Sequence, residues 1–413
     1  MIRNTNIRAA LIGAKLSHSF SPRIHAALAD YPYDLIELTE DEVGAFLHRG
    51  DFDALNVTIP YKKTVIPFLN ALSPEAERIG AVNTILRRAD GTLIGHNTDY
   101  AGFSDLVKDC GVSLQGKKVL ILGSGGASHT AQLVAADMGA RAVVVISRNG
   151  ADNYGNLDRH ADAEILINAT PVGMYPRNGE APLSLSVFPR LQAVLDMIYN
   201  PARTALLLEA EQRGIPHRNG LLMLVSQARR AAELFVHTVI ADIEVKRITK
   251  AIARDTENII LLGMPGCGKS TLGKRIAAQL GRTFFDCDEE LVKAVGRPIP
   301  QIFAEEGEES FRRYETETLG ALCKRSGLVI ATGGGVVTKE RNYRLMHQNG
   351  RILFLDIAPD ALPTDGRPLS QKKTPAVLYR ERLPLYRAMA DEIIPVGRDI
   401  EENVRKITGV LAK

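Results

Sequence analysis

The sequence contains no tryptophan and only four cysteines among its 413 residues. Cys110, Cys267, Cys287 and Cys323 are widely scattered and show none of the close spacings that zinc ligands require. A disulfide framework is therefore not expected, and free thiols in a reducing cytoplasm are the favoured interpretation.

Long apolar runs are also missing. No uninterrupted run reaches the roughly 20 residues that a membrane helix needs, and the N-terminus lacks the pattern of a secretory signal. The net charge of +3 is small for this length and gives no electrostatic reason to expect nucleic acid as a partner. With 45% hydrophobic and 24% charged residues, the composition is typical of a soluble globular protein, and the length predicts two or three domains.

Two glycine-rich junctions are the most prominent features of the chain. One is VLILGSGGASHTAQLVAADMG at residues 119–139, and the other is IILLGMPGCGKSTLGKRIAAQLG at residues 259–281. In each, a short apolar run meets glycines and a helix-period pattern follows, which is how a βα unit of a parallel sheet begins. The sequence therefore predicts an α/β protein with two nucleotide-binding sheets.

The segments around these junctions indicate further domains. Before the first junction, IRAALIG, DLIEL and NVTIP read as strands and PRIHAALAD as a helix, which predicts a separate α/β domain. Residues 221–253 form a long helical stretch that could be broken into two or more helices. The two halves should join near Ala253–Asn258, where no Gly/Ser-rich or Pro-rich tether is present.

The first glycine loop, Gly123 to Ala127, is suited to a dinucleotide. Glycines permit the backbone to approach a pyrophosphate, and the following helix N-terminus supplies N–H donors. Arg148 follows the second strand, where an arginine suits the 2′-phosphate of NADP better than an acid would. From this position alone, an exposed arginine without a ligand is an equally good interpretation.

The second loop, GMPGCGKS from Gly263 to Ser270, matches the phosphate-binding pattern GxxxxGK[ST] after an apolar strand. Lys269 would reach the β- and γ-phosphates, and the Ser270 hydroxyl would bind Mg²⁺. Asp286 and Asp288 stand two residues apart at a predicted strand end, so their side chains should point the same way. Further along the chain, Arg312 and Arg313 have a simpler alternative interpretation as part of a solvated helix face.

The first half resembles shikimate dehydrogenases. The resemblance is carried by KLSHSFSP (15–22), NVTIPYKK (56–63), GAVNTI (80–85), GHNTDYAGF (95–103), INATPVGM (167–174), DMIYNP (196–201) and NGLLMLVSQ (219–227). It implies a substrate-binding domain from residues 1–100 and 221–253 around a Rossmann-like NADP-binding domain at residues 101–220.

The resemblance also implies site residues. Lys62 and Asp99 would be the catalytic pair, with Lys62 polarising the ketone and delivering a proton to its oxygen. The substrate-binding residues would be Ser19, Ser21, Asn56, Thr58, Asn83, Thr98, Tyr199 and Gln227. The cofactor-binding residues would be Gly123, Ser124, Gly125, Gly126, Ala127, Arg148, Gly220 and Met223. Two positions depart from the family pattern. Asp152 stands where many NADP-using relatives carry a second arginine, which weakens the preference for NADP over NAD. His129 stands where an arginine is often found at the start of the helix after the glycine loop.

Residues 258–413 resemble shikimate kinases, through the phosphate loop, FFDCDEEL, IFAEEGEESFRRYE, VIATGGGVV, GRPLS and RERLPLYR. Catalytic roles would fall to Lys269, Asp288 and the lid residue Arg367. The substrate-binding residues would be Arg312, Gly333, Gly334, Gly335 and Arg382. The ATP-binding residues would be Gly263, Gly266, Gly268, Lys269, Ser270 and Thr271. Ser270 and Asp286 would bind Mg²⁺. The stretch from Asp356 to Arg367 is short and lacks an adenine-stacking arginine, which predicts weaker ATP binding.

Together the resemblances imply two consecutive reactions: NADPH-dependent reduction of 3-dehydroshikimate to shikimate, then phosphorylation of shikimate by ATP and Mg²⁺. Only small-molecule substrates are expected as partners, with neither nucleic acid nor membrane, and a homodimer is compatible with the sequence. One alternative is a quinate/shikimate dehydrogenase fused to a weakened small-molecule kinase. A non-catalytic scaffold is disfavoured, because Lys62, Asp99, Lys269 and Asp288 are all present.

Overall fold

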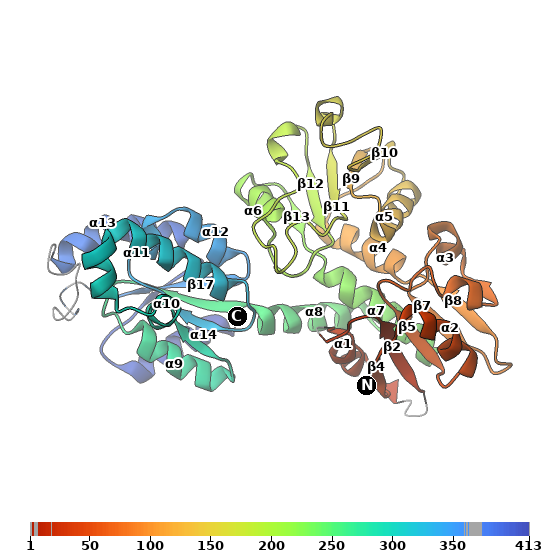
Figure 1. The fold of residues 1–413 in the computed structure, drawn as a ribbon, viewed down its shortest axis with the longest axis horizontal. Coiled ribbons are helices and arrows are strands. Elements are labelled where there is room, and N and C mark those ends of the chain that lie inside the picture. Colours follow the sequence, from red (N-terminus) through yellow and green to blue (C-terminus); the bar gives the residue numbers. More distant parts are fainter. Residues whose placement is uncertain are drawn as a thin grey trace. The chain divides into compact units, whose positions relative to one another are not determined.

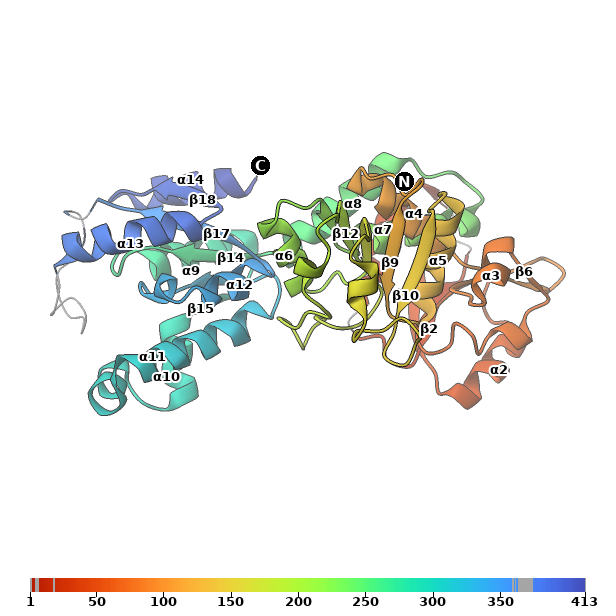
Figure 2. The same ribbon diagram turned by 90° about the horizontal axis from the view of Figure 1, so that it is seen from above.

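A computed structural model describes residues 2–3, 7–17, 19–358, 360, 362 and 374–412. The chain divides into two compact units. Unit 1 comprises Met1–Val172, Ala181–Tyr199 and Glu209–Ile252, and unit 2 comprises Gly173–Glu180, Asn200–Leu208 and Ala253–Lys413. Both units contain sheets flanked by helices (Figures 1 and 2), which confirms the predicted α/β class.

The N-terminal part of unit 1 is built on a six-stranded mixed sheet. Its strand order is β4 (Tyr33–Glu37), β2 (Ala9–Gly13), β5 (Ala54–Val57), β7 (Thr84–Arg87), β8 (Leu93–His96) and β6 (Ala71–Leu72). β2 runs parallel to β4 and β5, whereas β5, β7 and β8 alternate in direction. A small parallel pair joins β1 (Ile2–Arg3) to β3 (Ala29–Asp30). The helical segments around the sheet are α1 (Ser21–Leu28), α2 (Glu40–Arg49), η1 (Ile66–Phe68) and α3 (Pro74–Ile79).

Alternating residues of this sheet supply two separate apolar clusters. On β2, Ala9 packs with α1 and the helices after residue 220, while Ala10 and Ile12 pack with α2 on the other face. Side chains of successive strand residues point to opposite faces, so a short apolar strand can serve both clusters. The alternation explains why AALIG is buried at every position.

The second sheet of unit 1 is entirely parallel, in the order β10 (Ala142–Ile146), β9 (Lys118–Leu122), β11 (Ile165–Asn168), β12 (Ala193–Asp196) and β13 (His217–Arg218). The helices α4 (Asp99–Cys110) and α5 (Gly126–Asp137) pack side by side and against this sheet (Figure 1). The remaining connections include η2 (Leu157–His160), η3 (Leu185–Val187) and α6 (Ala205–Gln212). The strand before the first glycine loop therefore lies inside a parallel sheet, as predicted.

The predicted helical stretch after residue 220 forms two helices, α7 (Leu221–Val236) and α8 (Asp242–Thr256). α7 ends at His237, which adopts a left-handed backbone conformation with φ of 50°. α8 continues to within two residues of β14 (Asn258–Leu262), so the chain enters the last sheet directly from a helix. The expectation of a join without a long tether is confirmed.

Unit 2 contains a five-stranded parallel sheet, in the order β15 (Phe284–Asp286), β16 (Val329–Ala331), β14, β17 (Gly350–Asp356) and β18 (Glu392–Pro395). Figure 1 shows α9 and α14 on one side of it and α11, α12 and α13 on the other. The helical segments are α9 (Lys269–Leu280), α10 (Cys287–Val295), α11 (Ile299–Cys323), η4 (Val336–Thr338), α12 (Arg341–His347), α13 (Pro375–Met389) and α14 (Ile400–Leu411). Among the described residues, none of these or the earlier helices is long and apolar enough to cross a membrane.

Candidate functional sites

Lys62 and Asp99 meet as an ion pair in unit 1. Lys62 lies in the turn segment after β5, and Asp99 is the first residue of α4. The Lys62 ammonium donates a hydrogen bond to Asp99 Oδ2 over 2.6 Å. The two side chains are 30% and 16% exposed, so a small molecule can still reach the ammonium.

Three further predicted substrate residues join this pair. Asn83 Nδ2 donates to Asp99 Oδ1 over 2.9 Å and to Thr98 Oγ1 over 3.0 Å. Thr98 Oγ1 in turn donates to Gln227 Oε1 over 3.4 Å, across 129 positions of sequence. Residues from just before β7, the start of α4 and the middle of α7 therefore form one polar cluster.

Asn56 extends the cluster, and Tyr33 holds it in place. Asn56 Nδ2 donates to the Asn83 carbonyl oxygen and to Thr84 Oγ1. The Tyr33 hydroxyl donates to Asn56 Oδ1 over 2.7 Å and also hydrogen-bonds the Ser21 side chain. Sequence reasoning missed Tyr33, because a tyrosine at the start of a strand has no pattern that separates it from ordinary packing.

The remaining predicted substrate residues have simpler surroundings. Ser19 Oγ accepts a hydrogen bond from the Ser21 backbone N–H over 3.2 Å. Tyr199 packs edge-on against Phe20, with ring centroids 6.0 Å apart, and burial raises its pKa. The Thr58 and Tyr199 side chains have no hydrogen-bond partner among the described residues, which leaves both hydroxyls available to a ligand.

If the first half acts on shikimate, as its resemblance implies, replacing Tyr33 with phenylalanine should raise KM for shikimate about fivefold and leave kcat nearly unchanged. The change removes one hydrogen bond that orients Asn56, worth about 1 kcal/mol. Tyr31→Phe is the matched control, because the Tyr31 hydroxyl lies 2.5 Å from His25 Nδ1 and touches no predicted substrate residue. Steady-state kinetics of shikimate oxidation would test this, and equal KM values for the two variants would contradict it.

The first glycine loop has free space in front of its backbone. β9 ends at Leu122, and α5 begins at Gly126 with Gly125 at its N-cap. A Cβ atom added at Gly125 or Gly126 would meet no other atom within 4 Å, so the loop backbone faces free space. Ser124 and Ala127 are exposed beside them. Backbone N–H groups at a helix N-terminus and free space in front of them fit a pyrophosphate.

Arg148 is exposed two residues after the end of β10. This position fits both the predicted contact with a 2′-phosphate and an arginine without a ligand. The Asp152 carboxylate lies 2.8 Å from His160 Nε2. Gly220 is the N-cap of α7, and Met223 packs against the apolar cluster of the parallel sheet. His129 lies in the first turn of α5, close to the glycine loop in sequence and structure.

For the NADPH-dependent reaction that the resemblance implies, replacing Arg148 with alanine should raise KM for NADPH about tenfold and change KM for NADH little. A guanidinium and a 2′-phosphate form charge-assisted hydrogen bonds, and NADH lacks that phosphate. Arg190→Ala removes another exposed arginine of unit 1 and serves as the control. A parallel rise with both cofactors would show that Arg148 does not recognise the 2′-phosphate.

Unit 2 encloses a cavity of about 630 Å³ that collects most of the predicted kinase residues. Its lining includes Gly266, Gly268, Lys269, Ser270, Thr271, Asp286, Asp288, Arg312, Gly333, Gly334, Gly335 and Arg382. Gly263 directly follows β14 and is not among the lining residues. Loops at the carboxyl ends of β14, β15 and β16 therefore converge where parallel α/β sheets usually bind ligands.

The phosphate-loop residues are held by short polar contacts. Lys269 Nζ donates to the backbone carbonyl oxygens of Gly263 and Met264, over 2.8 and 3.0 Å. Ser270 Oγ donates to Asp286 Oδ2 over 2.5 Å, which brings together two oxygen groups of the kind that Mg²⁺ prefers. The donors present therefore fit both a polyphosphate and its metal ion.

The expected strand placement of both aspartates is wrong in part. Asp286 ends β15, but Asp288 lies in the first turn of α10. Asp286 caps this helix, and its Oδ1 accepts the Asp288 backbone N–H over 3.0 Å. Both residues still line the cavity, because a cap and not strand alternation brings them together.

Arg312 is buried and paired, whereas its neighbour Arg313 is exposed over the ring of Tyr314. Arg312 Nη1 donates to Glu315 Oε2 over 2.7 Å, and Arg382 Nη1 donates to the Gly334 carbonyl oxygen over 2.9 Å. Burial raises the pKa of Glu315. The simple interpretation of a solvated helix face therefore holds for Arg313 alone.

The glycines after β16 are required by their neighbours. A Cβ at Gly333 would lie 2.5 Å from Glu315 Oε1, and one at Gly335 would collide with the Arg312 guanidinium. The triplet thus lets the backbone approach the charged side chains of α11 as well as a ligand. Arg367 and most of the short stretch before it lie outside the described residues.

Comparisons with known proteins match both halves of the chain. Residues 11–85 match the shikimate dehydrogenase substrate binding domain, and residues 265–412 match shikimate kinase. A shikimate dehydrogenase (NADP(+)) from Clostridium perfringens (strain SM101 / Type A) is 36% identical over 246 residues, covering 54% of this chain and 90% of that protein.

Two solved structures extend the comparison. A chorismate mutase/shikimate 5-dehydrogenase fusion protein from Clostridium acetobutylicum superposes with a TM-score of 0.58 at 34% identity, covering 60% of this chain and 98% of that one. Shikimate 5-dehydrogenase from Thermus thermophilus, solved with NADP(H) and shikimate, gives a TM-score of 0.54 at 31% identity, covering 59% and 99%. The chain therefore belongs to the shikimate dehydrogenase family and carries, fused behind that enzyme, a domain of the shikimate kinase family at residues 265–412.

Proposed function

We propose that this chain reduces 3-dehydroshikimate to shikimate with NADPH and then phosphorylates shikimate to shikimate 3-phosphate with ATP and Mg²⁺. The observation that carries the proposal is the polar cluster of Lys62, Asn83 and Asp99, which unites a cationic proton donor with amide and carboxylate groups. The kinase cavity supports the second step with two arginines and two aspartates beside a phosphate loop.

In the reductase, NADPH would supply a hydride to the ketone carbon. Lys62 would polarise the carbonyl and give its proton to the developing alkoxide, while Asp99 holds the ammonium in position. Asn56, Asn83, Thr98 and Gln227 would hydrogen-bond the ring hydroxyls, and Ser19 and Ser21 would bind the carboxylate. This assignment favours shikimate over quinate, because a bulkier residue than these serines would be expected at a quinate carboxylate.

In the kinase, Arg312 and Arg382 would bind the substrate carboxylate, and Asp288 would accept the proton of the attacking hydroxyl. MgATP would supply the phosphoryl group. Lys269 would offset the charge that develops on the phosphoryl oxygens, with Ser270 and Asp286 holding the metal ion directly or through water. Arg367 would add a second cation from the lid.

We further propose the domain division 1–100 with 221–253, 101–220 and 258–413. A cytoplasmic location is supported by the four cysteines, all of which are buried free thiols. A homodimer is retained as a proposal because β4, an edge strand of the six-stranded sheet, has exposed residues at which a second copy would pair.

A single-tube assay would test the whole function. The full chain would receive 3-dehydroshikimate, NADPH and MgATP, with NADPH loss followed by absorbance and products identified by mass. Shikimate 3-phosphate should form only when ATP is present. Shikimate that accumulates despite ATP would contradict the kinase assignment and leave the dehydrogenase intact, whereas unchanged NADPH would contradict the dehydrogenase assignment.

A further inference from the structure

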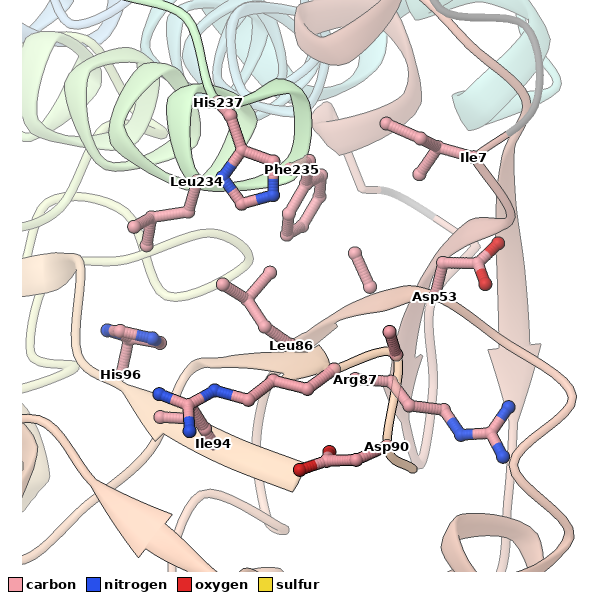
Figure 3. A pocket seen from close by; sticks show the side chains of 13 residues that line it. Ile7, Asp53, Leu86, Arg87, Asp90, Ile94, His96, Leu234, Phe235 and His237 are labelled. Atoms are coloured by element: carbon pink, nitrogen blue, oxygen red, sulfur yellow. The ribbon is translucent and has the colours of Figure 1, made fainter. Parts of the chain in front are cut away.

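A second cavity of about 840 Å³ lies in unit 1, and the proposed reactions do not use it. Figure 3 shows its two sides: Leu86 and Ile94 on the hairpin of β7 and β8, and Leu234, Phe235 and His237 at the end of α7. Leu86 and Ile94 form one apolar wall of the cavity, and Leu234 and Phe235 form the opposite one. The cavity is therefore suited to the apolar body of a ligand.

The charged groups around the cavity are not equally available. Asp53 is held by Arg8, whose backbone N–H donates to Asp53 Oδ2 over 2.9 Å. Asp90 accepts hydrogen bonds from the Thr92 backbone N–H and hydroxyl, over 3.0 and 2.7 Å. Arg87 donates to the Gly50 carbonyl oxygen over 2.9 Å. Both carboxylates and one of the two lining arginines are thus already engaged.

Three basic side chains at the cavity have no hydrogen-bond or ion-pair partner among the described residues. Within the part of the chain that the structure describes, Arg88, His96 and His237 make no side-chain hydrogen bond or ion pair. Burial lowers the pKa of His96; the charge of Arg230 lowers it further, Glu75 acts in the opposite direction, and Arg88 adds a smaller lowering. An anionic group would satisfy these donors.

The backbone conformation of His237 determines where its side chain lies. His237 has a φ of 50°, and it is the one non-glycine residue with positive φ in the described chain. The left-handed conformation is a common way for a helix to end, and histidine adopts it more readily than most residues that carry a side chain. Here the conformation ends α7 and places the imidazole at the cavity, as Figure 3 shows.

We propose that this cavity is a binding site for a small apolar molecule with one carboxylate, separate from both catalytic sites. Its apolar ring would lie between the β7–β8 hairpin and the end of α7, and its carboxylate would bind Arg88 with His96 or His237. A guanidinium suits the two oxygens of a carboxylate, and the apolar walls exclude a bare inorganic anion as the preferred ligand.

The probe for the test is naphthalene-2-carboxylate, titrated calorimetrically into the full chain. Shikimate, NADPH and ADP would be present in excess, because they fill both catalytic sites without allowing either reaction. We expect saturable binding of one equivalent. Binding that disappears when shikimate, NADPH and ADP are added would place the probe in the catalytic sites and overturn the proposal.

Variants sharpen this test. Arg88→Gln should weaken binding of the carboxylate about tenfold, whereas Arg190→Gln, at another exposed arginine, should leave it unchanged. The neutral amide naphthalene-2-carboxamide should bind Arg88→Gln and the unaltered chain equally. Leu234→Trp should abolish binding by filling the cavity. Equal affinity of Arg88→Gln and Arg190→Gln for the carboxylate would overturn the assignment.

Discussion

Replacing Lys62 with alanine should lower kcat for reduction of 3-dehydroshikimate about a thousandfold. The substitution removes the only ammonium that the structure brings to Asp99 in the polar cluster of unit 1, as far as the described residues show. A positioned general acid accelerates proton transfer by roughly 10² to 10⁴. The loss should fall on kcat more than on KM, because the substrate's hydroxyls would still be bound by Asn83, Thr98 and Gln227.

The chain provides its own controls for this experiment. Lys63→Ala changes the neighbouring lysine, which is exposed and away from Asp99, and should retain near-normal kcat. Kinase activity of Lys62→Ala on added shikimate should be unaffected, and thermal unfolding followed by circular dichroism should show that unit 1 remains folded. Stopped-flow or steady-state absorbance of NADPH measures the result. A Lys62→Ala rate within tenfold of the unaltered chain would exclude Lys62 as the proton donor.

Replacing Lys269 with methionine should lower kinase kcat by about a thousandfold. In the structure its ammonium is buried against the Gly263 and Met264 carbonyl oxygens, which places it inside the phosphate loop. A preorganised cation in such a loop stabilises charge that develops in the transition state, and loss of one such group typically costs roughly 10² to 10³ or more. Methionine keeps similar length and bulk without the charge.

The matched control is Lys274→Met, on the same helix but exposed over the ring of Phe284. It should keep kinase activity within a few fold. Dehydrogenase activity should be normal in both variants, and thermal unfolding followed by circular dichroism should show intact kinase structure. A coupled assay for ADP would measure the kinase. Comparable kinase rates in Lys269→Met and Lys274→Met would contradict the proposed role of Lys269.

The sequence predicted the parts of this fold that local pattern controls. Glycine-rich loops after apolar strands led directly to β9 with α5 and to β14 with α9, and the helical pattern after residue 220 led to α7 and α8. Local pattern failed where a single hydrogen bond decides the structure. Asp288 belongs to a helix and not to a strand, because the Asp286 carboxylate caps that helix.

The candidate sites were predictable to a similar extent. Motifs identified Lys62, Asn83 and Asp99, but not that one carboxylate bridges the other two residues. Tyr33 has no motif, since its importance comes from the Asn56 side chain that it contacts across the fold. Glu315 stands in the motif IFAEEGEESFRRYE, but the motif did not show that it pairs with Arg312. The cavity beside His237 was unpredictable for the same reason: its walls come from a hairpin and a helix end that are far apart in sequence.

The burial of all four cysteines has a practical consequence for thiol chemistry. Cys323 is fully buried, and burial raises its pKa to about 12, while burial also raises the pKa values of Cys110 and Cys287. The thiolate is the reactive form, so alkylating dyes should modify these positions slowly. A cysteine introduced on each enzyme's surface could then be labelled selectively in the otherwise unaltered chain. Fluorescence energy transfer between the two labels would follow the separation of dehydrogenase and kinase during turnover.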